Sequence, residues 1–274
     1  MYYQHQLHYE YPERCDEHML KVKRCREVKL DENYPYLQKT VWFKCQRAFY
    51  WVMQNAVIFW LLRITHGLKI HGKKNLKKHK AALKNGAITI SNHVFMWDYL
   101  CVLKAIRPHL AYFPAWKDNL EGSFGGAIRM SGGIPIPTHN IHAMMKFNQA
   151  MEEVLKSGKW MHFYPEGSLW FYYPDIRPFK PGVFKYAVKF EKPVIPLVFS
   201  FRPRKGIQKL FGKKPLVDLH IWEPLFPKTS LPPYAASAQM RAEAYHVMQV
   251  MCGITPDHPN YRTDQDPAHY QKTM

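Results

Sequence analysis

Acidic residues are scarce in this chain of 274 residues, in which 21 Asp and Glu stand against 39 Lys and Arg and leave a formal net charge of +18. This deficit favours an anionic partner, and charge alone fits a nucleic acid, an anionic bilayer or an acidic protein equally well. The five cysteines include no Cys-x-x-Cys and no metal-ligand spacing. We therefore expect ordinary thiols, a reducing compartment and no metal site.

Long apolar runs are also missing. Within residues 41–64, the longest uncharged part runs from Ala48 to Leu62, and its 15 residues fall short of the ~20 that a helix needs to cross a bilayer. Residues 1–32 are polar and tyrosine-rich with nothing resembling a cleavable leader, so we expect no signal peptide and a loosely ordered arm over residues 1–40. No internal repeat or low-complexity tract is visible.

Aromatic side chains concentrate where the polar arm ends. Residues 41–68 combine tryptophans and phenylalanines with flanking Lys44, Arg47 and Arg63, a composition typical of a helix that lies in or dips into one leaflet. The alternative is a core helix, because the protein interior favours the same residues. The aromatic residues expected at the membrane are Trp42, Trp51, Phe59 and Trp60.

Lysines follow this segment closely. Lys73, Lys74, Lys77 and Lys78 form a basic cluster that we expect to face anionic lipid, where each charge is worth about 1 kcal/mol. The alternative is a solvated connection. A second cluster, over residues 202–214, lies between two predicted strands and is a candidate for the same face.

Short apolar strands alternate with helical stretches from residue 83 onward, which predicts an α/β fold with a mostly parallel central sheet flanked by helices. The predicted strands are 87–91, 110–113, 133–136, 160–164, 194–201 and 217–221. The predicted helices are 97–106, 120–130, 141–157, 183–190 and 235–251. We expect a single catalytic domain over residues 69–230, preceded by the arm and the interfacial helix, and followed by a C-terminal helix and tail over residues 231–274.

A histidine and an aspartate stand five positions apart after the first of these strands, in Asn92-His93-Val94-Phe95-Met96-Trp97-Asp98. If the chain folds back here, Asp98 can accept a hydrogen bond from one imidazole nitrogen and leave the other free to take a proton from an alcohol. The spacing therefore predicts His93 as a general base that Asp98 orients.

Further unusual residues end other strands, where parallel sheets gather their chemistry. The segment from Ser131 to Thr138 is a glycine-turned strand with prolines, and Tyr164-Pro165-Glu166-Gly167-Ser168 follows a buried strand directly. Arg177 and Lys180 precede a predicted helix whose amino end favours an anion, so they are a candidate phosphate site. The alternative is that Arg177 and Lys180 are surface charges on a loop.

In this order and at these separations, the motifs resemble those of the lysophosphatidic acid acyltransferase family over residues 70–224. The resemblance implies an O-acyltransferase that moves a fatty acyl group from an acyl-CoA or acyl-carrier-protein thioester to a lysophospholipid hydroxyl, without a cofactor. It also implies that Glu166 contacts the acceptor, with a structural ion pair as the alternative. The residues predicted to bind substrate are Asn92, Gly133, Thr138, Glu166, Gly167, Ser168, Arg177 and Lys180.

Two positions depart from the pattern of that family, which commonly has arginines where this chain has Thr138 and Leu169. Losing a bidentate phosphate ligand leaves other lysolipids or alcohols open as acceptors beside lysophosphatidic acid. The expected location is the cytoplasmic face of a membrane, bound peripherally or monotopically, with membrane lipids and no nucleic acid as partners. The readings from other classes are a basic nucleic-acid-binding protein, which has no recognition motif here, and a non-catalytic membrane-binding protein.

Overall fold

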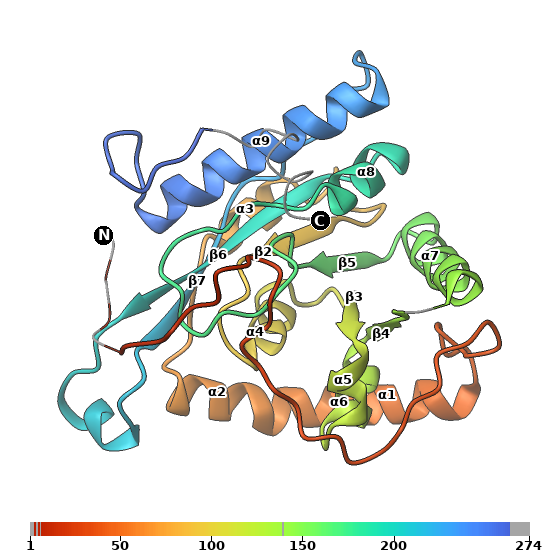
Figure 1. Cartoon of the computed structure of the whole chain (residues 1–274), viewed down its shortest axis with the longest axis horizontal. Coiled ribbons are helices and arrows are strands. Elements are labelled where there is room, and N and C mark those ends of the chain that lie inside the picture. Colours follow the sequence, from red (N-terminus) through yellow and green to blue (C-terminus); the bar gives the residue numbers. More distant parts are fainter. Residues whose placement is uncertain (1–2, 4, 6, 139, 264–274) are drawn as a thin grey trace.

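The structure is a computed structural model that describes residues 3, 5, 7–138 and 140–263, so residues 264–274 of the predicted tail lie outside the described residues. Its centre is a seven-stranded sheet in the order β1-β7-β6-β2-β5-β3-β4 (Figure 1). Every neighbouring pair is parallel except β6 and β7, which are antiparallel, as expected for a mostly parallel sheet. The strands are β1 (Lys69–His71), β2 (Ile88–Ser91), β3 (Ala111–Trp116), β4 (Gly133–Ile136), β5 (Trp160–Phe163), β6 (Val194–Arg202) and β7 (Leu216–Ile221).

Helices cover both faces of the sheet, which explains why the residues of its central strands β2 and β5 are buried on both faces rather than in alternation. The helical segments are α1 (Val41–Met53), a π-helical turn η1 (Gln54–Ile58), α2 (Phe59–Thr65), α3 (Lys73–Lys78), α4 (Asp98–Ala105), α5 (Lys117–Glu121), α6 (Gly125–Ser131), α7 (Ile141–Lys156), α8 (Gly182–Lys189), a 3₁₀ turn η2 (Gly206–Phe211) and α9 (Pro233–Cys252). The predicted fold class is confirmed.

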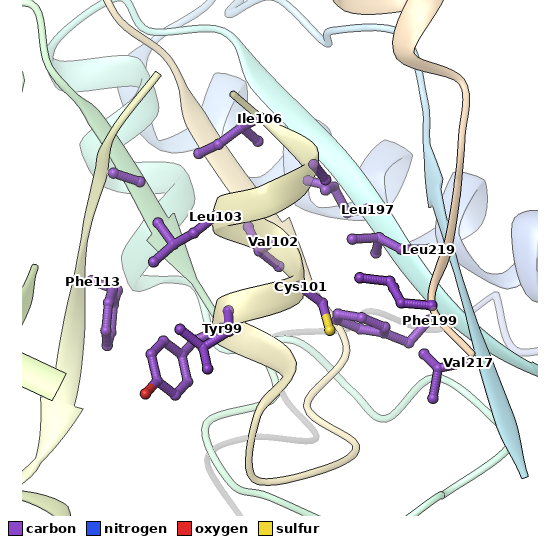
Figure 2. Packing of buried hydrophobic residues seen from close by; sticks show 14 of the residues in the cluster. Tyr99, Cys101, Val102, Leu103, Ile106, Phe113, Leu197, Phe199, Val217 and Leu219 are labelled. Carbon is purple, nitrogen blue, oxygen red and sulfur yellow. The ribbon is translucent and has the colours of Figure 1, made fainter. Parts of the chain in front are cut away.

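Helix α4 fills the core on one face of the sheet. Its Cys101 and Val102 are fully buried, and Figure 2 shows them directed at Phe199 of β6 and Leu219 of β7. On β6 the alternate residues, such as Val198, belong to a second apolar cluster that contains α7, α8 and α9. The two clusters hold β2 and β5 between them, so the carboxyl ends of these strands are fixed in place.

Helices α1 and α2 continue into one another through η1 and form one long helix along the lower edge of the molecule in Figure 1. Thr40 caps its start by accepting a hydrogen bond from the amide of Phe43. Its two central polar residues are accommodated locally, since Gln54 Nε2 donates to Ser131 Oγ at 2.9 Å and Asn55 Nδ2 donates to the carbonyl of Trp51. Within the described ranges, the helices are all too short or too polar to cross a membrane.

Two elements differ from the sequence prediction. The single helix expected over residues 120–130 is broken into α5 and α6, because Gly122 adopts an extended conformation between them. The chain after α2, for which no strand or helix was predicted, forms β1 and α3. Gly72 makes the turn between these two elements with φ of 79°, in close approach to the carbonyl of Ile221.

Replacing Phe199 with alanine should lower the free energy of unfolding by about 3–5 kcal/mol, because its ring is buried between α4 and the sheet and would leave a cavity. Urea unfolding at neutral pH measures the change. Phe211→Ala is the control, since that ring is exposed. Equal effects of the two substitutions would contradict this account of the core.

Candidate active site

The loop that leaves β2 turns back so that His93 meets the first residue of α4. His93 Nδ1 lies 2.6 Å from Asp98 Oδ2, and the same oxygen accepts hydrogen bonds from the amides of Val94 and Phe95 at 3.0 and 3.4 Å. The carboxylate is fully buried, and the amino end of α4 favours its negative charge. Because Nδ1 is committed to Asp98, Nε2 is the nitrogen available to take a proton.

Tyr164 completes this arrangement from the neighbouring strand β5. Its hydroxyl donates to Asp98 Oδ1 at 2.6 Å, and its ring stacks on the His93 imidazole with centroids 3.8 Å apart. Burial raises the pKa of the Tyr164 phenol well above its ordinary value, so the group stays a donor. Sequence reasoning missed this role, although β2 and β5 are adjacent and Tyr164 directly follows β5.

Glu166 and Arg177 form a buried ion pair behind the histidine. Arg177 Nη2 lies 2.6 Å from Glu166 Oε2, and the side chains are 2% and 1% exposed. Glu166 Oε2 also accepts from the amide of His93, and Oε1 accepts from the amide of Arg177. This geometry matches the structural alternative rather than contact with an acceptor. It also removes Arg177 from the expected phosphate site.

Three other predicted binding residues are engaged inside the protein. Asn92 pairs with the backbone of Phe199 through both its amide nitrogen and its oxygen, at 3.0 and 2.8 Å. Ser168 donates to the carbonyl of Cys15 and accepts from Arg177. Gly133 is required for packing, since a Cβ there would approach Ile128 closely. These residues shape the loops of the site instead of facing its interior.

A cavity of about 530 Å³ opens in front of the histidine. His93, Thr138, Gly167 and Lys180 line it, so four of the predicted site residues are brought together. The side chain of Lys180 packs over Gly167, whose φ is 81° and whose missing Cβ leaves room for the lysine stem. Much of the remaining wall is aromatic or aliphatic, as is typical of pockets that bind apolar ligands. Leu169 also lines the cavity, so both departures from the family pattern lie where substrate would bind.

The N-terminal arm supplies another wall of the cavity, in contrast to the loose order expected for it. The arm crosses the site between two anchors: the amide of Met19 donates to the carbonyl of Leu169, and the amide of Cys25 donates to that of Glu121. Between these anchors, Leu20 and Val22 line the cavity. No periodic pattern of apolar residues predicts this contact, because the arm docks as irregular chain.

Among the residues that the structure describes, His18 and His162 also lie at the site. His18, from the arm, stacks on Trp116 and accepts a hydrogen bond from the amide of Leu169, while burial, followed by the nearby charge of His93, lowers its pKa to about 4. His162 is buried beneath Tyr164, and burial lowers its pKa to about 3. Both imidazoles are therefore neutral at pH 7.

The aromatic run that follows Ser168 packs beneath the arm. Trp170 and Tyr172 are buried, with Trp170 stacked on Tyr11 and Tyr172 stacked on Tyr9. The amides of Trp170 and Tyr172 donate to the carbonyls of His93 and Val94. The run thus belongs to the core that supports the histidine loop.

The long α1–α2 helix exposes an apolar stripe away from the sheet. Trp42 and Trp60 are 72% and 62% exposed, and Phe49, which lies between them in the sequence, is also exposed. Phe59 is instead buried in the core, and Trp51 is half-buried beneath the Arg107 guanidinium, so these two predicted membrane contacts face inward. The other exposed apolar residues of the stripe are Val41, Val52, Met53, Val57, Leu61 and Ile64.

The lysines of α3 are exposed, and Lys78 pairs with Glu223 at 2.6 Å. Although Lys73 is largely exposed, partial desolvation of its ammonium group, followed by the nearby charge of Arg107, lowers its pKa. Since Arg107 packs over Trp51 and Phe59, this end of α3 lies close to the long helix. Among the described residues, no group of three or more His, Cys, Asp or Glu side chains could hold a metal ion.

The fold and the His93–Asp98 pair are those expected of an acyltransferase. The model of the Acyltransferase family matches residues 67–200, so these residues form an acyltransferase domain. Among solved structures, it is similar to the crystal structure of the 1-acyl-sn-glycerophosphate (LPA) acyltransferase PlsC from Thermotoga maritima, with 19% identity and a TM-score of 0.50 over 80% of this chain and 91% of that chain. No curated protein matches. The resemblance seen in the sequence is thereby confirmed for family, fold and enzyme class.

Glu166→Gln should lower the free energy of unfolding by about 3–5 kcal/mol, because it leaves the buried Arg177 charge without its partner. Chemical denaturation measures the loss. Glu223→Gln is the matched control, since it removes an equally short but exposed ion pair with Lys78 and should change stability little. If both variants behave alike, the buried pair is not what stabilises this corner.

Tyr164→Phe should reduce kcat by about tenfold to hundredfold, because a hydrogen bond to a charged group is worth about 1.5–3 kcal/mol. The phenyl ring keeps the stack on His93, so substrate KM should stay near its wild-type value. Tyr186→Phe is the control, since its hydroxyl bonds Asn148 on the far side of the sheet. An unchanged kcat in Tyr164→Phe would show that Asp98 needs no second support.

Proposed function

We propose that this acyltransferase works at a membrane surface, moving a fatty acyl group from an acyl-CoA or acyl-carrier-protein thioester to the hydroxyl of a lysophospholipid, with lysophosphatidic acid as the first candidate. The 2.6 Å contact between His93 and Asp98 at the mouth of a largely apolar cavity carries the proposal. Another lysolipid or alcohol acceptor is the alternative, because Thr138 and Leu169 line the cavity in place of arginines.

The chemistry needs a base and a positioned alcohol, since the thioester is already activated. His93 Nε2 removes the proton from the lipid hydroxyl, and the alkoxide oxygen attacks the thioester carbonyl carbon. As the tetrahedral intermediate collapses, the carbon–sulfur bond breaks and the imidazolium gives its proton to the leaving thiolate. Asp98 holds Nδ1 and stabilises the imidazolium throughout, and the acyl group ends as an ester.

Lys180 is the lysine placed to attract an anionic acceptor. It lines the cavity together with His93, whereas the Arg177 side chain is buried in an ion pair with Glu166. A single ammonium gives a point charge rather than the fork of an arginine, which favours a phosphate without fixing its orientation. This arrangement supports a phosphate-bearing lysolipid and leaves room for a substituted headgroup.

The apolar stripe supports action at a membrane surface. Its tryptophans suit the headgroup zone, and its aliphatic residues can enter the acyl layer, while the opposite side of the helix is fixed to the core by Phe59 and Leu62. A monotopic or peripheral attachment follows, on the face where the thioester donors are found, which we propose to be cytoplasmic.

A panel of lysophosphatidic acid, other lysophospholipids and glycerol 3-phosphate, each offered with both thioester donors, tests the function. We expect an ester product with at least one lysophospholipid, and a loss of about 10²–10⁴ in kcat for His93→Ala and Asp98→Asn. Thiol release and lipid product are measured together, and circular dichroism checks the fold of both variants. Full turnover by His93→Ala would overturn the mechanism.

A further inference from the structure

The hairpin between β6 and β7 ends in an exposed apolar tip that the site does not use. In η2, Ile207 is 73% exposed, Leu210 is 82% exposed and Phe211 is 54% exposed. Three large apolar side chains on a six-residue turn have no role in the core clusters. Exposure of these side chains to water is unfavourable, so the tip is suited to contact with an apolar environment outside the protein.

Cations surround the same tip. Lys205, Lys209, Lys213 and Lys214 are all exposed, and residues 202–215 contain no Asp or Glu. Long lysine stems can keep their ammonium groups at the level of lipid phosphates while neighbouring apolar side chains lie deeper. The tip therefore combines the two features that bind an anionic lipid surface, a basic ring and an apolar wedge.

The hairpin is attached to the end of the long helix that carries the apolar stripe. Arg204 Nη2 donates to the carbonyl of Thr65 at 2.6 Å, and the amide of Val217 donates to the carbonyl of His66 at 2.9 Å. In Figure 1 the cyan hairpin lies at the lower left, beside the end of α2. Trp60 and Ile64 expose the stripe in this last part of the helix.

We infer that the η2 tip is a second membrane contact, which binds an anionic lipid surface with its lysines and inserts Ile207, Leu210 and Phe211 among the acyl chains. The inference rests on the proposed action at a membrane, which it deepens by naming the lipid charge and a second point of attachment. A helix alone allows the molecule to roll about its axis, whereas a helix and a separate tip fix which side of the protein faces the bilayer.

Co-sedimentation of the full chain with vesicles of equal phosphatidylglycerol and phosphatidylcholine tests the tip. The variant Ile207→Ser/Leu210→Ser/Phe211→Ser should bind at least tenfold more weakly than the wild type. The matched control is Ile141→Ser/Met145→Ser, which removes two exposed apolar residues of α7 and should bind like the wild type. Thermal unfolding without lipid should be alike for the three proteins.

A second variant isolates the charge. With Lys205, Lys209, Lys213 and Lys214 all replaced by glutamine, binding to the anionic vesicles should fall about tenfold, while binding to pure phosphatidylcholine vesicles should not change. Binding of the tip variant within twofold of the α7 control, or equal losses of the lysine variant on both vesicle types, would overturn the inference.

These readouts separate the tip from the enzyme. Vesicle binding needs no acyl transfer, so it judges the tip even if every acceptor fails. Conversely, the tip variant should keep wild-type turnover of a water-soluble short-chain lysolipid, because η2 contributes no residue to the cavity. Loss of that turnover would assign the tip a role in the active site and contradict the inference.

Discussion

The buried carboxylate of Glu166 is the constraint on which the histidine depends. It binds the Arg177 guanidinium, the Arg177 amide and the backbone amide of His93 together, so the loop after β2 and the loop after β5 share one charge. A buried pair of this kind contributes less to net stability than to the choice of one arrangement, because the alternatives leave a charge unpaired. Glu166 therefore positions the backbone of His93 rather than lining the cavity.

The sequence predicts the strands and the helix that position the site better than it predicts which side chains line the cavity. The alternation of apolar strands with helices located β2, β5 and α4 within a residue or two, and the spacing of His93 and Asp98 anticipated their hydrogen bond. These features are encoded locally, by strand ends and a helix start. Whether Glu166 faces a substrate or Arg177 depends on how the loop after β5 folds back on itself, and the residues next to Glu166 in the sequence do not indicate which.

The long helix shows the same limit. Its composition indicated aromatic residues at a boundary, yet only one side of any helix can face lipid, and Phe59 and Trp51 turn toward the protein. A helix that is apolar all round hides which side is which, since core and membrane favour the same residues. The polar residue Gln54 lies on the inward side of the helix, where its side chain donates a hydrogen bond to Ser131.

The arm that walls the cavity has a consequence for folding. The carbonyl of Cys15 accepts a hydrogen bond from the hydroxyl of Ser168, which lies 153 positions further along the chain. His5 contacts the carbonyl of Tyr172, which is 167 positions away. Closing loops of this length costs entropy before any contact compensates for it. During synthesis, the arm must wait for residues 168–172 to emerge before it can dock. The wall that the arm gives to the cavity is therefore completed late.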